Sequence, residues 1–150
     1  MVLAAVNDGI YNLTLFLHIL TVLVAFAPAF VHPVLTAQVG GAAGVSSPWL
    51  AAMHRNGRRI YAPALVVAGL LGFALQGFSD GVWSLGQTWL WLSVVLWVAM
   101  NGILHAVLLP AERSMAGGDT SAEAKLGAAG AAVAVLMLVV LALMVFKPGA

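Results

Sequence analysis

The chain has 150 residues, of which 63% are hydrophobic and only 7% are charged, and its formal net charge at pH 7 is +1. A soluble domain carries about 25% charged residues, so this chain has too little charge to cover a soluble surface and is expected to lie in a membrane. The near-zero net charge argues against a nucleic-acid partner, and the lack of cysteine excludes disulfides, thiolate metal sites, covalent haem attachment and iron–sulfur ligation.

Four apolar segments are long enough to cross the hydrocarbon core of a bilayer, which takes about 20 helical residues. No basic leader or small-residue cleavage pattern marks the first segment as a signal peptide, so we expect it to be retained. The links between the segments are short, so the sequence predicts one all-α domain, a four-helix up-and-down bundle. The expected spans are residues 10–37, 60–78, 89–109 and 126–146.

Two prolines bear on where the predicted helices begin and end. Ser47 followed by Pro48 is typical of an N-cap with proline in the first turn, so the second helix is expected to begin near Pro48, ahead of its span. Pro110 is expected to end the third helix.

Most basic residues fall on one side of the predicted bundle. Because cytoplasmic loops are enriched in Lys and Arg, both longer links are expected in the cytoplasm and both termini on the non-cytoplasmic side. The expected location is the bacterial inner (cytoplasmic) membrane. The first and third links carry Arg55, Arg58, Arg59, Arg113 and Lys125, whereas Lys147 stands on the other side.

The polar residues of the first span recur at steps of three and four and fall on one helix face. Polar side chains facing lipid would lack hydrogen bonds, so this face is expected to turn towards the bundle interior. Its histidines, His18 and His32, are 14 residues apart. That spacing is about 21 Å along the axis, so they cannot share one metal ion. The face comprises Tyr11, Thr14, His18, Thr21, Ala25, Pro28 and His32.

The third span carries one further histidine, His105. We expect it at the depth of His32, so the two would lie within reach of each other if the first and third helices face one another. His18 has no histidine partner at its depth, where Gln76 and Ser93 are candidate hydrogen-bonding groups.

An imidazole inside a membrane either joins helices through a hydrogen bond, which is a structural role, or binds a ligand or transfers a proton, which is a functional role. Both interpretations stay open for His18, while the helix-end position of His32 favours the structural one for His32 and His105. Asn101 is expected to form a hydrogen bond between helices. His54, beside the arginines, is expected to be solvated or to lie among lipid headgroups.

The remaining patterns narrow the function further. No Asp or Glu lies within the four predicted spans, which argues against a small exporter built around a membrane carboxylate. Phosphate-binding glycine loops and nucleophile–base pairs are also absent from the sequence. The fourth span holds small residues at packing spacing, which predicts a helix that docks on a neighbour. These residues are Gly127, Gly130, Ala131 and Ala134.

Several short stretches resemble a known family. They are "LHIL", "RRIYAPALVVAGLLGFAL", "WSLGQTWLWLSVVLWV" and "NGILHAVLLP". Together they resemble the small four-span bacterial proteins grouped as DUF2269, described only as predicted integral membrane proteins, over roughly residues 10–115. More distantly, the layout resembles the HemJ-type protoporphyrinogen oxidases and the CopD copper-resistance membrane domain.

The HemJ-type resemblance implies haem b, with an important histidine in the first span and an important lysine in the third. His18 matches the histidine, but residues 89–109 contain no lysine, and Ser93 stands near its expected place. This difference argues against oxidase activity but not against haem binding. The CopD-type resemblance implies copper, for which His18, His32 and His105 are the candidate imidazole ligands.

The leading hypothesis is a redox-associated bundle that binds haem b, with His18 as axial ligand and His32 and His105 as a second cofactor site. The same three histidines are the candidate haem-iron or copper ligands. No catalytic residue is assigned, and enzymatic activity is not expected. Two alternatives stay open: a non-enzymatic accessory subunit of a larger membrane complex, and copper or small-solute transport. The partners expected are the lipid bilayer and either further copies of the chain or a larger complex.

Overall fold

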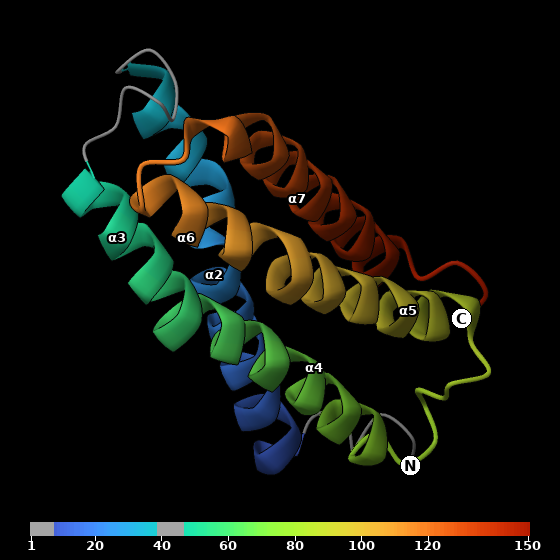
Figure 1. Ribbon diagram of the computed structural model, residues 1–150. Helices are drawn as coiled ribbons and strands as arrows, with labels where there is room; N and C mark the ends of the chain where they lie inside the picture. The colour runs from blue at the N-terminus through green and yellow to red at the C-terminus, as the bar shows by residue number, and fades with distance from the viewer. Residues whose placement is uncertain (1–7, 39–46) are drawn as a thin grey trace.

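The computed structural model describes residues 8–38 and 47–150, and every regular element in them is helical (Figure 1). In chain order the elements are α2 (Gly9–Gln38), α3 (Ser47–Asn56), η2 (Gly57–Tyr61), α4 (Ala62–Gly77), α5 (Thr88–Ile103), η3 (Leu104–Leu108), α6 (Leu109–Ala116), η4 (Thr120–Ala122) and α7 (Glu123–Phe146).

These elements join into four long helices, because α3, η2 and α4 follow one another without a break, as do α5, η3 and α6, and η4 and α7. All four are long and apolar enough to cross a membrane, which confirms the predicted all-α architecture with four spans. In the described residues after the gap, the second helix is present from Ser47 and so includes Pro48, near which it is predicted to begin. The four segments are Gly9–Leu35, Pro48–Gly77, Thr88–Ala116 and Thr120–Phe146.

The third helix does not end at Pro110, as predicted, but continues through it to Ala116. Proline lacks an N–H, and in an α-helix its ring collides with the carbonyl four residues back. Here the π-helical turn η3 precedes the proline, and the Leu109 N–H donates to the Leu104 carbonyl, five residues back. The wider turn displaces the obstructing carbonyl and lets the helix run on. The π-helical turn η2 stands before Pro63 in the same way.

The four helices pack chiefly as two pairs, α2 with α4 and α5 with α7, and α7 also contacts α2. Helices α3 and α6 pack together at one end of the bundle (Figure 1). Side chains from all four long helices meet in the main hydrophobic core, which includes Phe26, Leu65, Met100, Leu104 and Met137.

The polar face of α2 turns inward, as predicted. Tyr11, Thr14 and His18 are each 8% exposed or less, whereas Leu13 and Phe16 on other faces are about 60% exposed. This arrangement leaves aliphatic and aromatic side chains on the outside of the bundle.

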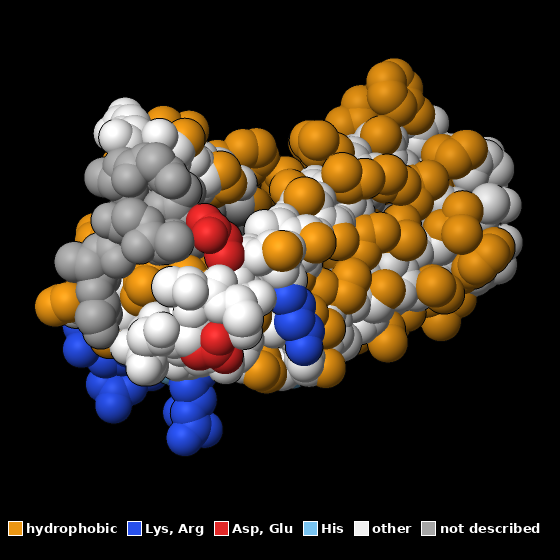
Figure 2. Space-filling model, turned by 45° about the horizontal axis from the view of Figure 1, so that its top comes forward, with side chains coloured by type: hydrophobic (Ala, Val, Ile, Leu, Met, Phe, Trp, Pro, Cys, Tyr) orange, Lys and Arg blue, Asp and Glu red, His pale blue; other side chains and the backbone are white. Residues whose placement is uncertain are grey.

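The two ends of the bundle differ in chemistry. Figure 2 shows Lys and Arg side chains gathered towards one end, beside Asp and Glu side chains, while hydrophobic side chains are spread over the surface towards the other end. We call this the arginine end, defined by Arg55, Arg58, Arg59 and Arg113, which lie on α3, η2 and α6.

Aromatic side chains gather at the opposite end, where α2 begins and α7 ends. The Trp83 Nε1–H donates to the Tyr11 hydroxyl at 3.0 Å, and the Trp83 and Trp89 rings meet edge to face with centroids 5.5 Å apart. The Lys147 ammonium lies 4.6 Å from the centre of the Trp83 ring. These four residues define the aromatic end, which ties the α4–α5 link to the start of α2 and the end of α7.

Candidate functional site

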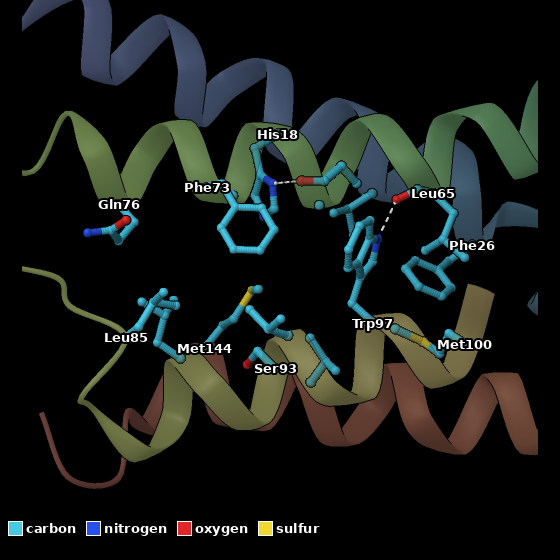
Figure 3. Close-up of a pocket in the computed structure, with 17 residues that line it drawn as sticks. His18, Phe26, Leu65, Phe73, Gln76, Leu85, Ser93, Trp97, Met100 and Met144 are labelled. Atoms are coloured by element: carbon cyan, nitrogen blue, oxygen red, sulfur yellow. Dashed lines mark hydrogen bonds between the residues drawn. The ribbon is translucent and has the colours of Figure 1, made fainter. Parts of the chain in front are cut away.

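His18 bridges α2 and α4. Its side chain is 7% exposed, and its Nδ1 lies 2.8 Å from the Ala68 carbonyl oxygen (Figure 3). Because a carbonyl only accepts hydrogen bonds, Nδ1 carries the proton and Nε2 carries the lone pair. The predicted partners are wrong: Gln76 donates to the Trp83 carbonyl, and Ser93 donates to the Trp89 carbonyl in its own helix.

Trp97 bonds to α4 in the same manner as His18. Its Nε1–H donates to the Leu65 carbonyl at 2.8 Å (Figure 3). Leu65 and Ala68 each stand four residues before a glycine, and in a helix the Cβ of the later residue leans back over the earlier turn. A Cβ on Gly69 would overlap the Trp97 indole, and one on Gly72 would reach 3.5 Å from His18. Gly69 therefore leaves the Leu65 carbonyl open to Trp97 of α5, whereas a side chain at Gly72 would make an ordinary contact with His18 of α2.

A small apolar cavity of about 80 Å³ lies beside His18 (Figure 3). For comparison, a cavity of about 150 Å³ in another protein holds a benzene molecule. Haem is much larger than benzene, so a porphyrin does not fit beside His18 in this arrangement of the helices. The side chains around the cavity include Phe26, Phe73, Trp97, Met100 and Met144.

The other two candidate ligands lie on elements that do not face each other. His32 is half-buried on α2 and packs edge to face against Tyr61, with ring centroids 6.2 Å apart. His105 is exposed in η3. The pairing of His32 with His105 required α2 to face α5, but α2 packs mainly against α4 and against α7. Within residues 8–38 and 47–150, no group of three or more His, Cys, Asp or Glu is placed to hold a metal ion.

A larger cavity of about 370 Å³ lies nearer the arginine end and draws residues from all four long helices. The space exists because residues with little or no side chain line it from both α2 and α7. A Cβ on Gly127 would meet nothing within 4 Å, so these small residues border open space instead of a tight helix contact. The small lining residues are Ala25, Ala29, Gly127, Gly130, Ala131 and Ala134.

Glu112 is the residue of this cavity that the sequence analysis missed. It lies on α6, is 4% exposed and lines the cavity. Its Oε2 has no hydrogen-bond partner among the described residues. A third helix that ends at Pro110 would leave Glu112 in a link, whereas the continued helix carries it into the bundle. The signal was present in the sequence, because Leu104, Leu108 and Glu112 follow at steps of four.

His54 is half-buried and faces Glu112, so it is not fully solvated, while its predicted place among lipid headgroups stays a prediction. Its side chain is 18% exposed, and its Nδ1 lies 3.8 Å from Glu112 Oε2. That distance is too long for a hydrogen bond, and Nδ1 also lacks a partner in the described part of the chain. Packing of α3 against α6 brings the two residues together.

Asn101 does not join two helices, contrary to the prediction. Its Nδ2 donates to the Trp97 carbonyl at 2.9 Å, within the same helix. A residue four positions back offers the nearest carbonyl on the same face, so the bond forms locally.

The chain matches no protein-family model, no curated protein and no solved structure. The functional assignment therefore depends on the residues and their geometry, and the resemblance to DUF2269, HemJ-type and CopD-type proteins stays a prediction.

Proposed function

We propose that this chain is a multi-pass membrane protein that binds a small apolar amine in the cavity beside Glu112, as a carrier of such solutes. The observation that carries the proposal is the Glu112 carboxyl group, which is buried and has an unpartnered oxygen. A buried polar atom without a partner costs about 1–3 kcal/mol of stability. A ligand that supplies the missing hydrogen bond accounts for the presence of such a group in an apolar bundle.

The cavity has the size and lining of a small-molecule site. Its volume of about 370 Å³ lies within the range of about 300–1,000 Å³ for ligand pockets, which are mostly apolar with a few polar groups. The polar side chains that line it are Glu112, Glu123, His32 and Tyr61, and no Lys or Arg is among them. The two carboxyl groups and the aromatic rings of Phe26 and Tyr61 favour an ammonium group, and the aliphatic walls favour an apolar body.

The backbone around the cavity is also unusual. The π-helical turns η2 and η3 both contribute lining residues, Gly57 and Tyr61 from the first and Leu104 and Leu108 from the second. Single π-helical turns within α-helices occur frequently at functional sites. The turns thus support a ligand site at this depth of the bundle.

The test compares two ligands of the same shape, 1-naphthylmethylamine and 1-naphthylmethanol, binding to the purified chain in detergent. We expect the amine to bind at least tenfold more tightly, because a hydrogen bond to a charged group contributes about 1.5–3 kcal/mol. Glu112→Gln should remove this preference. Asp80→Asn is the matched control, because it removes the same charge from an exposed turn at the aromatic end. Equal binding of both ligands to the unaltered chain would contradict the proposal.

The second candidate function is the haem b site predicted at His18, and one observation favours it. The Nδ1–H bond to the Ala68 carbonyl leaves Nε2 as the ligand atom, as in metal-bound histidines oriented by a backbone carbonyl. The donor atom therefore suits haem iron, but the cavity of about 80 Å³ does not admit a porphyrin. A Soret band that is lost in His18→Ala and kept in His105→Ala would establish this function. Colourless protein with no spectral change on adding haem would remove it.

A further inference from the structure

We propose a second ligand site, at the arginine end, that binds a phosphate group. His54, Arg55, Arg58 and Arg59 line a pocket of about 230 Å³ on α3 and η2. This pocket shares no lining residue with the cavity of the proposed amine site, although His54 of the pocket faces Glu112 of the cavity, and its ligand has the opposite charge. The inference therefore does not depend on the proposed function.

The spacing of the four residues places them on one side of the helix. Arg58 follows His54 by four positions, and Arg59 follows Arg55 by four, so each pair lies one turn apart. All three arginines are exposed, whereas His54 is half-buried at the back of the pocket. The pocket thus has three exposed guanidinium groups and one half-buried imidazole.

The charge of the pocket is not balanced by the protein. Within residues 8–38 and 47–150, no carboxylate lies within ion-pair distance of Arg55, Arg58 or Arg59, and the Glu112 carboxyl group faces His54 at 3.8 Å. Three cations in one pocket repel each other, and an anion held between them removes that repulsion. The planar guanidinium fork matches two phosphate oxygens, which makes phosphate the fitting anion.

The position of the pocket indicates where the phosphate comes from. The pocket residues lie within the apolar helix Pro48–Gly77 near its first end, where a spanning helix meets the headgroup region. Basic pockets at this level of membrane proteins bind anionic lipid headgroups. A free phosphate ester has the same recognition chemistry, so the experiment must separate the two sources.

The experiment measures lipid binding to the full chain in detergent by native mass spectrometry. Phosphatidylglycerol is the anionic probe, phosphatidylcholine the zwitterionic one, and inorganic phosphate the soluble competitor. Each arginine lost should weaken phosphatidylglycerol binding about fivefold, so Arg58→Gln/Arg59→Gln should weaken it about 25-fold. The control Arg113→Gln/Lys125→Gln removes the same charge at the same end, outside the pocket, and should change binding less than threefold.

The possible outcomes distinguish a specific phosphate-binding site from nonspecific attraction of lipid to the basic end of the protein. A preference for phosphatidylglycerol that only the pocket variant loses supports a lipid phosphate site. Displacement of the lipid by millimolar inorganic phosphate supports the site and assigns it to a soluble phosphate. Equal loss in both double variants, or no loss in either, overturns the proposal. The variant Arg58→Lys/Arg59→Lys keeps the charge without the fork, and its binding should fall between those of the wild-type chain and the glutamine variant.

Discussion

Two side-chain hydrogen bonds to main-chain carbonyls join α4 to its neighbours, one from His18 and one from Trp97. In a membrane, such bonds contribute on average about 0.6 kcal/mol and at most about 1.7 kcal/mol each. Gly69 matters at least as much, because a Cβ at this position would overlap the Trp97 ring. The close approach of Trp97 to α4 thus depends on the missing side chain of Gly69.

At the residue scale, Gly69→Ala should destabilise the protein markedly, while Gly72→Ala should not. The alanine Cβ at position 69 would overlap the Trp97 ring, and such overpacking typically costs about 1–3 kcal/mol. At position 72 the new Cβ would lie at an ordinary contact distance of 3.5 Å from His18. Thermal unfolding in detergent measures the difference between the two variants. Equal melting temperatures would show that the Trp97 contact does not hold the bundle together.

Gly57 shows why Glu112 and His54 come so close. A Cβ at this position would lie 2.8 Å from the Leu109 side chain and 3.0 Å from Glu112 Oε2. Glycine therefore lets α6 approach η2 and encloses the carboxyl group. The burial of Glu112 follows from a missing side chain on the opposite helix.

At the element scale, the π-helical turn η3 sets the direction of the residues after it. A π-helical turn holds one residue more than an α-helical turn, and each residue of an α-helix rotates by about 100°. Relaxing η3 to an α-helix would therefore turn α6 about its axis by roughly that angle. Pro110 disfavours this relaxation, because it cannot make the α-helical hydrogen bond.

Pro110→Ala should accordingly weaken naphthylmethylamine binding while leaving the helix content unchanged. The alanine restores a backbone donor, so η3 can convert to an α-helix and carry Glu112 out of the cavity. Fluorescence titration gives the affinity, and circular dichroism gives the helix content. Wild-type affinity in this variant would mean that the π-helical turn does not position the carboxyl group.

The small residues of α7 give a second test at the element scale. Gly130→Leu should abolish binding of both naphthyl ligands, because a Cβ there has only Leu108 nearby, at 3.9 Å, and the longer side chain fills the cavity. Ala128→Leu is the matched control on the same helix, since Ala128 is exposed and does not line the cavity. Binding that survives in both variants would place the ligand elsewhere.

At the scale of the whole molecule, the bundle has an apolar outer surface between two polar ends. We propose that it lies in a bacterial cytoplasmic membrane with the arginine end in the cytoplasm, in keeping with the enrichment of basic residues on that side. Assembly with further copies or with a larger complex also stays a proposal. The size of the particle extracted in gentle detergent tests it.

The orientation can be tested directly because the chain has no cysteine. Ser84→Cys lies in the exposed link at the aromatic end, and Ser114→Cys is exposed on α6 at the arginine end. A maleimide that cannot cross membranes should label Ser84→Cys in intact cells and should label Ser114→Cys only after lysis. The reverse pattern would invert the proposed orientation.

Properties that depend on one helix at a time could be predicted from the sequence. The four spans follow from the length of apolar runs. The inward face of α2 follows from the need of Thr14 and His18 to avoid lipid. The arginines gather at one end because they lie in the first and third links, and successive links of an up-and-down bundle alternate between its two ends. Each of these rules acts along a single segment of chain.

Properties that depend on two helices required the tertiary structure. Apolar runs do not encode which helices become neighbours, so the sequence could not show that His18 meets Ala68 or that α2 packs mainly against α4 and α7. The 3.6-residue periodicity of an α-helix also does not predict where a π-helical turn, which holds one more residue, occurs. The helix end predicted at Pro110 therefore left Glu112 outside the predicted third span. Hydropathy is a property of each segment, whereas the site is set by how neighbouring helices are rotated against one another.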